Sequence, residues 1–137
     1  MLITAIKQTS PGRLTVMLED EREIKTTLGV VTDLRLFSGR ELDEGGLAEL
    51  ERESRRALTR EKALEYLSRR AMSRKELEKK LTDKGYDEED AAYCAAWLAE
   101  RGLIDDASYA AAVARHYSTK GYGPGRIRSE LSRRGID

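Results

Sequence analysis

Carboxylates stand side by side at two places in the sequence, where they could act as acid and base or bind a cation. Residues 87–90 read DEED, and Asp105 is followed directly by Asp106. Each group lies where a helix is predicted to begin, and the helix dipole stabilises carboxylates in a first turn. Calcium loops need ligands spread through a glycine-containing turn, and adjacent residues diverge on a helix. The sequence therefore favours helix capping over cation binding or catalysis at both places.

The other candidates for chemistry are a glycine-rich segment and two isolated ligand-type residues. Residues 121–125 read GYGPG, which is similar to a phosphate-binding loop, but they follow a predicted helix rather than a strand, and Pro124 has no N–H to donate. We expect a connector there, or a loop whose Tyr122 contacts a partner. His116 and Cys94 each lack the further ligands that a metal site needs. No nucleophile with a base can be assembled, so the sequence predicts a non-enzymatic protein without cofactor or metal.

Cations are concentrated on predicted helices in the second half of the chain. The first group is Arg69, Arg70, Arg74, Lys75, Lys79, Lys80 and Lys84, and the second is Arg115, Lys120, Arg126, Arg128, Arg133 and Arg134. Any one of these side chains is most simply a solvated surface residue. Together they exceed what solubility requires and indicate a surface for an anionic partner. We predict that these residues, with Tyr122, contact a partner protein or DNA.

Charges of the two signs balance over the chain but are segregated along it. The 25 Lys and Arg equal the 25 Asp and Glu, yet residues 71–86 carry +2, residues 87–110 carry −6 and residues 111–137 carry +4. Alternating signs suit a partner whose own surface presents both, more than they suit bare nucleic acid. The single cysteine excludes an intramolecular disulfide, and no apolar run approaches the ~20 residues that span a bilayer. These features predict a cytoplasmic protein that does not enter a membrane.

Many of these cations lie on a helix that occurs twice in the sequence. Residues 73–87 read SRKELEKKLTDKGYD and align, fifty positions apart, with residues 123–137, which read GPGRIRSELSRRGID. Ser73 and Glu76 predict a capping box, and Pro124 suits the first position of a helix. Each copy ends in a cation followed by glycine, which is typical of a helix C-terminus. Each copy is thus predicted to be a short basic helix with one narrow apolar stripe.

The helical part of the chain is predicted to form two repeats. The first covers residues 44–104 and starts with a long lead-in segment, which is one helix or two helices joined near Thr59. The second covers residues 105–137 and lacks a third helix, because its last residue, Asp137, aligns with Asp87, where the acidic third helix of the first repeat begins.

An incomplete second repeat has a consequence for its apolar residues. Ile127, Leu131 and Ile136 would face nothing contributed by their own chain, whereas repeat arrays normally end in a polar cap. We expect either that the natural chain continues past Asp137 or that something else covers this face. The protein would then be a monomer, or a dimer through its exposed C-terminal face.

Residues 1–43 are predicted to form a separate small module. Apolar and polar residues alternate as in β-strands at Leu14, Val16 and Leu18, at Ile24, Thr26 and Leu28, and less regularly at Leu2, Thr4 and Ile6. Val30, Leu34 and Phe37 follow at helical spacing and predict one short helix on the sheet. The fold class is therefore mainly α, with tandem three-helix repeats, the second incomplete, preceded by a small β-rich α+β module.

The order and spacing of these segments resemble those of the RecX family of regulators of the RecA recombinase. The most specific segment is WLAERGLIDDASYA at residues 97–110, which follows SRKELEKKLTDKGYD and precedes GPGRIRSELSRRGID. The resemblance covers residues 60–137. It implies a non-enzymatic regulator with roles in DNA repair, recombination and the SOS response. Such a regulator binds the RecA filament on single-stranded DNA along its groove, and restrains filament growth, ATP hydrolysis and strand exchange. Members of this family generally have three units, and this chain departs from them by ending within the second.

Two other functions fit the residues. Three-helix units resemble helix-turn-helix folds, in which case Arg126, Arg128, Arg133 and Arg134 would contact DNA directly. The protein could also be a structural adaptor without any nucleic-acid contact. Binding to naked DNA should fall steeply with salt, whereas a regulator of the recombinase should act on recombinase-coated DNA.

Overall fold

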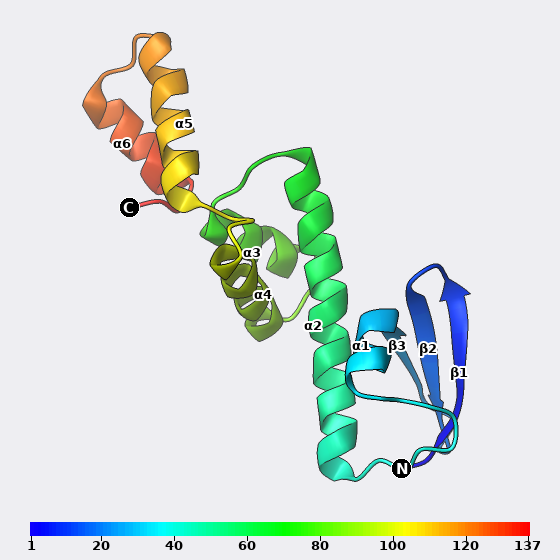
Figure 1. The fold of residues 1–137 in the computed structure, drawn as a ribbon. Helices are drawn as coiled ribbons and strands as arrows, with labels where there is room; N and C mark the ends of the chain where they lie inside the picture. Colours follow the sequence, from blue (N-terminus) through cyan, green and yellow to red (C-terminus); the bar gives the residue numbers. More distant parts are fainter. The chain divides into compact units, whose positions relative to one another are not determined.

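The computed structural model describes residues 1–137, which form two compact units, Met1–Arg60 and Glu61–Asp137. We call them the N-terminal unit and the C-terminal unit. Strands occur only in the N-terminal unit, and the C-terminal unit is entirely helical (Figure 1). The predicted class, helical repeats preceded by a small β-rich module, is confirmed.

A three-stranded antiparallel sheet forms the first part of the N-terminal unit. Its strands β1 (Ile3–Ser10), β2 (Arg13–Leu18) and β3 (Glu23–Thr27) are hydrogen-bonded in chain order. Pro11 and Gly12 connect β1 to β2, and Gly12 has a φ of 76°, a backbone conformation that glycine adopts without strain. This order and these turns are those that the alternating pattern predicts.

The prediction that Leu2, Thr4 and Ile6 share one face of β1 is wrong at the start of the strand. Ile3 is fully buried, whereas Thr4 is exposed. The pairing of β1 with β2 shifts between Ile3 and Ala5, so a β-bulge changes which residues face the core. A period-of-two pattern cannot reveal such a bulge, because it depends on the partner strand.

The short helix on the sheet also differs from its prediction. The helix α1 (Leu28–Asp33) starts earlier, and Thr27 caps it by accepting a hydrogen bond from the N–H of Val30. Phe37 lies beyond the helix and is 58% exposed, and Leu28 is 56% exposed. Residues of the sheet, of α1, of the following helix and of the connection between these two helices form the core of the N-terminal unit, which consists of Ile3, Val16, Leu18, Val30, Leu36, Leu42, Leu50 and Ala57.

The long lead-in segment is one continuous helix, α2 (Glu44–Arg69), and not two helices joined near Thr59. The hydroxyl of Thr59 donates to the carbonyl of Arg55, at 2.7 Å, which lets this residue remain inside a helix. Gly46 lies in the first turn, where its N–H donates to the side chain of Asp43 at 2.6 Å. Neither α2 nor any other helix is sufficiently long and apolar to cross a bilayer.

Four further helices make up most of the C-terminal unit: α3 (Arg74–Asp83), α4 (Glu88–Glu100), α5 (Asp106–Thr119) and α6 (Pro124–Arg133). We call the end of α2 with α3 and α4 the first repeat, and α5 with α6 the second repeat. The core lies in the first repeat and is composed of Ala63, Tyr66, Met72, Leu77, Leu81, Ala91, Ala95, Leu98 and Ile104.

The two matched segments, residues 73–87 and 123–137, have the same local structure. The helices α3 and α6 each have ten residues, and the N-cap residues Ser73 and Gly123 have closely similar φ and ψ angles. Each helix ends at a glycine of positive φ, Gly85 at 96° and Gly135 at 78°. The capping box of α3 is also present, with the N–H groups of Ser73 and Glu76 donating to each other's side chains at 3.1 and 3.0 Å. The prediction that the helix occurs twice is therefore confirmed.

The C-terminal end of α6 packs on the start of α3. The hydroxyl of the buried Ser73 donates to the carbonyl of Arg134, and Gly135 lies so close to Lys75 that a Cβ atom on the glycine would be 2.6 Å from the lysine Cβ. The N–H of Arg74 donates to Asp106, at the start of α5, at 2.9 Å. These contacts join the two repeats within the C-terminal unit.

The packing corrects one expectation about the end of the chain. Ile136 is only 8% exposed, so it does not face solvent as predicted, because the end of α6 is covered by the first repeat. Ile127 and Leu131 are half-buried. Of the three apolar residues, only Ile127 and Leu131 are therefore accessible for a dimer contact. The dimer stays a prediction.

Candidate partner-binding surface

Four of the predicted partner-binding cations in the first repeat are ion-paired with nearby carboxylates. The pairs are Arg69 with Glu65 at 3.0 Å, Arg70 with Glu76 at 3.4 Å, Arg74 with Glu78 at 3.4 Å and Lys79 with Asp83 at 2.8 Å. Ion pairs on an exposed helix surface contribute only ~0–1 kcal/mol each and exchange readily with a partner's charges. Each paired carboxylate does, however, offset the charge of its cation, so these four pairs add little net positive charge to the surface.

The remaining three cations of the first repeat have no carboxylate partner. Lys75 and Lys84 are exposed, and neither is hydrogen-bonded through its side chain. The ammonium group of Lys80 lies over the ring of Tyr66, 4.4 Å from its centre. Lys80, in the last turn of α3, and Lys84, its C-cap residue, are spaced four residues apart and therefore lie on the same side of the helix end.

In the second repeat, two of the predicted binding residues are hydrogen-bonded to Glu130. Arg133 and Arg134 both donate to its carboxylate, and these two arginines lower the pKa of Glu130 to about 2. Arg134 is half-buried and also donates to the hydroxyls of Tyr109 and Tyr117, at 2.8 and 3.3 Å. Arg134 therefore connects α5 to the end of α6. The residues next to it in the sequence do not predict this role.

The glycine-rich loop is fixed by a stack of side chains. The guanidinium of Arg126 lies 3.8 Å from the centre of the Tyr122 ring, and Tyr122 stacks on Tyr117 with the ring centres 5.1 Å apart. Lys120 lies 5.8 Å from the Tyr117 ring. Because Tyr122 already stacks on Tyr117 and contacts Arg126, its ring is poorly placed to stack on a nucleic-acid base. That Tyr122 contacts a partner stays a prediction.

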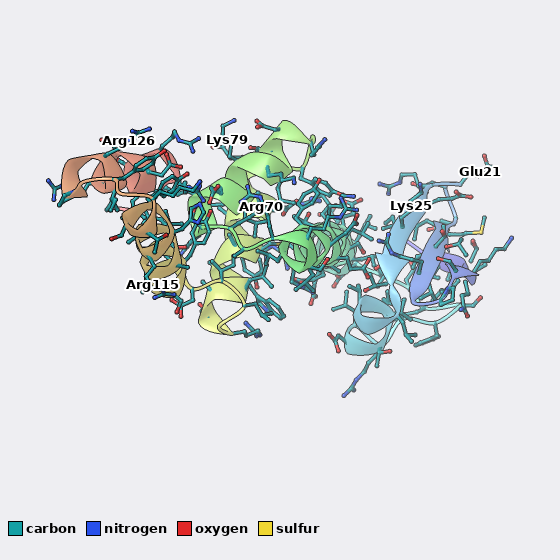
Figure 2. All side chains as sticks on the ribbon, turned by 90° about the horizontal axis from the view of Figure 1, so that it is seen from above. Glu21, Lys25, Arg70, Lys79, Arg115 and Arg126 are labelled. Carbon is teal, nitrogen blue, oxygen red and sulfur yellow. The ribbon has the colours of Figure 1, made fainter.

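Arg115 and Arg128 are the two cations of the second repeat that are exposed and have no internal partner. Within the C-terminal unit, Figure 2 shows the labelled Arg126 and Lys79 along one side and Arg115 along the opposite side. The predicted cations are thus distributed around this unit and do not form a single continuous face.

The acidic candidates cap helices, as predicted. Asp87 caps α4 by accepting from the N–H of Asp90, and Asp105 caps α5 by accepting from the N–H of Ser108. The backbone and hydroxyl hydrogen bonds from Ser108 lower the pKa of Asp105. Asp106 points elsewhere and accepts from the N–H of Arg74, so the adjacent carboxylates do not form a pair.

The isolated ligand-type residues are also far from forming a site. Cys94 is fully buried in α4, and His116 packs edge-on against the ring of Tyr117. No group of three or more histidine, cysteine or acidic side chains is arranged to hold a metal ion. What the C-terminal unit presents to a partner is therefore charged helical surface.

The sequence reasoning missed three residues that surround Lys80 and Lys84. Lys62, Tyr66 and Tyr86 line a pocket together with Arg69, Lys80 and Lys84. A signal for it was present, since Lys62, Tyr66 and Arg69 recur at helical spacing and share one side of α2.

Family models identify both repeats. The model described as RecX, first three-helix domain, matches residues 60–98, and the model described as RecX, second three-helix domain, matches residues 105–137. A crystal structure of regulatory protein RecX superposes with a TM-score of 0.81 and 31% identity over 99% of this chain and 68% of that chain. This chain belongs to the RecX family.

Other RecX proteins are similar to part of this chain. The regulatory proteins RecX of Stenotrophomonas maltophilia strain R551-3 and of Pseudomonas entomophila strain L48 are 44% and 42% identical to it over 77 and 78 residues, or 56% and 57% of this chain. These stretches cover 47% and 50% of the two relatives, so the chain spans about half the length of the curated relatives it matches. The RecX crystal structure from Lactobacillus salivarius has a TM-score of 0.57 and 32% identity, over 61% of this chain and 55% of that chain.

Proposed function

We propose that this RecX family protein binds the RecA filament on single-stranded DNA and restrains its growth, its ATP hydrolysis and strand exchange. It acts by binding and without catalysis, in the cytoplasm, and serves DNA repair, recombination and the SOS response. The observation that carries the proposal is the tandem arrangement of two RecX-type helical repeats in one compact unit, each with exposed cations.

The distribution of charge supports a protein-coated strand as the partner. Lys75 and Lys84 in the first repeat, and Arg115 and Arg128 in the second, are exposed and free to pair with a partner's anions. The start of α4 carries exposed carboxylates at Glu88 and Glu89. A filament presents protein side chains of both signs together with phosphates, and this mixture is complementary to alternating basic and acidic segments.

Two joined repeats also give a physical reason for restraint. A ligand shifts an equilibrium only by its different affinities for the two states. If the two repeats contact neighbouring recombinase subunits, the linked contacts strengthen each other and hold those subunits in one relative arrangement. Steps that need the subunits to move, such as ATP turnover, are then slowed.

The direct test is RecA's DNA-dependent ATP hydrolysis, measured with increasing amounts of this protein. The proposal predicts a progressive decrease that saturates as the filament is occupied. An unchanged rate of hydrolysis at every ratio would contradict it and would favour a protein that contacts naked DNA or has no nucleic-acid role.

A further inference from the structure

A cationic pocket lies in the first repeat, away from the contacts that join the two repeats. It has a volume of about 350 Å³ and is lined by Lys62, Tyr66, Arg69, Lys80, Lys84 and Tyr86. The helices α2 and α3 provide four of these residues, Lys84 caps the C-terminal end of α3, and Tyr86 follows the next glycine. Pockets of this size commonly hold a small molecule or one group of a larger ligand.

The pocket is strongly positive. Four of its six lining residues are cations, and none is acidic. One carboxylate, that of Glu65, is paired with the two cations of α2: it lies 3.2 Å from the ammonium group of Lys62 and 3.0 Å from the guanidinium of Arg69. Lys80 and Lys84, at the end of α3, have no carboxylate partner, so a net positive charge remains to be matched by a ligand.

Two of the ammonium groups contact the ring of Tyr66. Tyr66 is only 3% exposed, and Lys62 and Lys80 lie over its ring at 5.3 and 4.4 Å from the centre. The negative face of an aromatic ring attracts cations and so offsets part of their mutual repulsion. The hydroxyl of Tyr66 is buried and has no hydrogen-bond partner in the chain. Lys62 and Lys80 are thus both in contact with Tyr66 at the pocket without any ligand.

We propose that this pocket binds a phosphate group. A phosphate offers several acceptor oxygens and up to two negative charges, which suits lysines on two helices and an arginine better than the two oxygens and single charge of a carboxylate. The same chemistry occurs in two sources, a free phosphate compound and the phosphodiester backbone of a single strand. The site does not depend on the proposed function, because it requires neither recombinase nor filament.

The experiment uses the whole chain and titrates it with three probes while amide NMR signals are recorded. The probes are inorganic pyrophosphate, a short oligothymidylate without terminal phosphates, and a hexapeptide of aspartate and glutamate. Binding in the pocket should shift the signals of Tyr66, Lys84 and Tyr86. A tighter interaction with pyrophosphate would assign the site to free phosphate compounds, and a tighter interaction with the oligothymidylate would assign it to the strand backbone.

A double variant tests whether the pocket itself is responsible. Lys80→Gln with Lys84→Gln should weaken binding of the preferred phosphate probe by about tenfold, because two charge-assisted contacts are lost. The matched control is Lys7→Gln with Lys25→Gln, which removes the same charge at exposed positions outside the pocket and should leave the affinity within about twofold. Each single variant, Lys80→Gln and Lys84→Gln, should have an intermediate effect, and circular dichroism verifies that all variants stay folded.

Three outcomes would overturn the proposal. The first is that neither phosphate probe shifts the signals of the pocket residues. The second is that the acidic peptide binds there more tightly than both phosphate probes. The third is that the control variant weakens binding as much as the pocket variant, which would show an effect of overall charge alone.

Discussion

The carboxylate of Glu130 lies 2.9 Å from the Nε atom of Arg134, the C-cap residue of α6. Arg134 in turn donates to Tyr109 and Tyr117 on α5. A cation predicted to face a partner thus connects the two helices of the second repeat. Its charge remains satisfied within the chain, so Arg134 is better suited to stability than to binding.

This network predicts a specific dependence of stability on pH. Hydrogen bonds from Arg133 and Arg134 lower the pKa of Glu130 from 4.5 to about 2. Because the pKa is lower in the folded state, the stabilisation is fully present above pH 4.5 and is lost as the pH falls toward about 2. The free energy of unfolding of Glu130→Gln should be lower than that of the wild type at neutral pH, and the two should converge in this acidic range.

Urea denaturation at several pH values measures that difference. Glu49→Gln is a suitable control, because Glu49 is exposed on α2 and has no ion pair. Its difference from the wild type should be small at every pH. A Glu130→Gln protein that loses stability as steeply as the wild type between pH 4.5 and about 2 would show that the network contributes nothing.

Gly135→Ala should destabilise the protein more than the same change at the matched glycine. Both Gly85 and Gly135 have positive φ, where alanine costs about 1 kcal/mol. Only at Gly135 would the added Cβ meet another atom, the Cβ of Lys75 at 2.6 Å, while Gly85 has nothing within 4 Å. Overlap with a backbone-anchored atom adds about 1–3 kcal/mol. Chemical denaturation of both variants tests this, and equal losses would mean that the repeats are not in contact at Gly135.

Ser73→Ala should remove two interactions at once. The side chain of Ser73 accepts from the N–H of Glu76 and donates to the carbonyl of Arg134, and the residue is fully buried. We expect a loss of about 1–3 kcal/mol, since a cap and a buried hydrogen bond disappear together. Ser132→Ala, at an exposed position of α6, should change stability by less than about 0.5 kcal/mol. A loss at Ser73 no larger than that of the control would contradict this assignment.

Charge reversal on α6 should weaken the effect on the recombinase without unfolding the chain. Arg128 is exposed and unpaired, and Arg126 is exposed above Tyr122. The double variant Arg126→Glu with Arg128→Glu should need about tenfold more protein for the same decrease in RecA's ATP hydrolysis, through lost attraction and new repulsion. The control, Lys7→Glu with Lys25→Glu, reverses two exposed charges of the N-terminal unit. Equal potency of the α6 variant and the wild type would place the contact surface elsewhere.

Local signals in the sequence predicted much of the helical fold. The capping box at Ser73, the first-turn Pro124 and the final glycines each act within a few residues, so their structural effect can be derived from the sequence alone. Aligning the two segments fifty positions apart then revealed the repeat.

What the sequence did not predict depends on contacts between distant residues. Ile3 is buried at a register shift in the pairing of β1 with β2, and Ile136 is buried next to Arg134 and Gly135, which contact the start of α3. The internal role of Arg134 likewise depends on tyrosines of another helix. Sequence periodicity reports one face of one element, and it does not say which other element lies against that face.

The most direct test of the central claim compares binding of this protein to single-stranded DNA coated with RecA and to the same strand when naked, over increasing salt concentration. A fluorescent label on the protein reports binding by anisotropy. The proposed function predicts tighter binding to the coated strand, maintained at salt concentrations that abolish binding to the naked strand, because phosphate contacts alone are strongly salt-dependent. Equal or tighter binding to the naked strand, with the steep salt dependence of phosphate contacts, would contradict it.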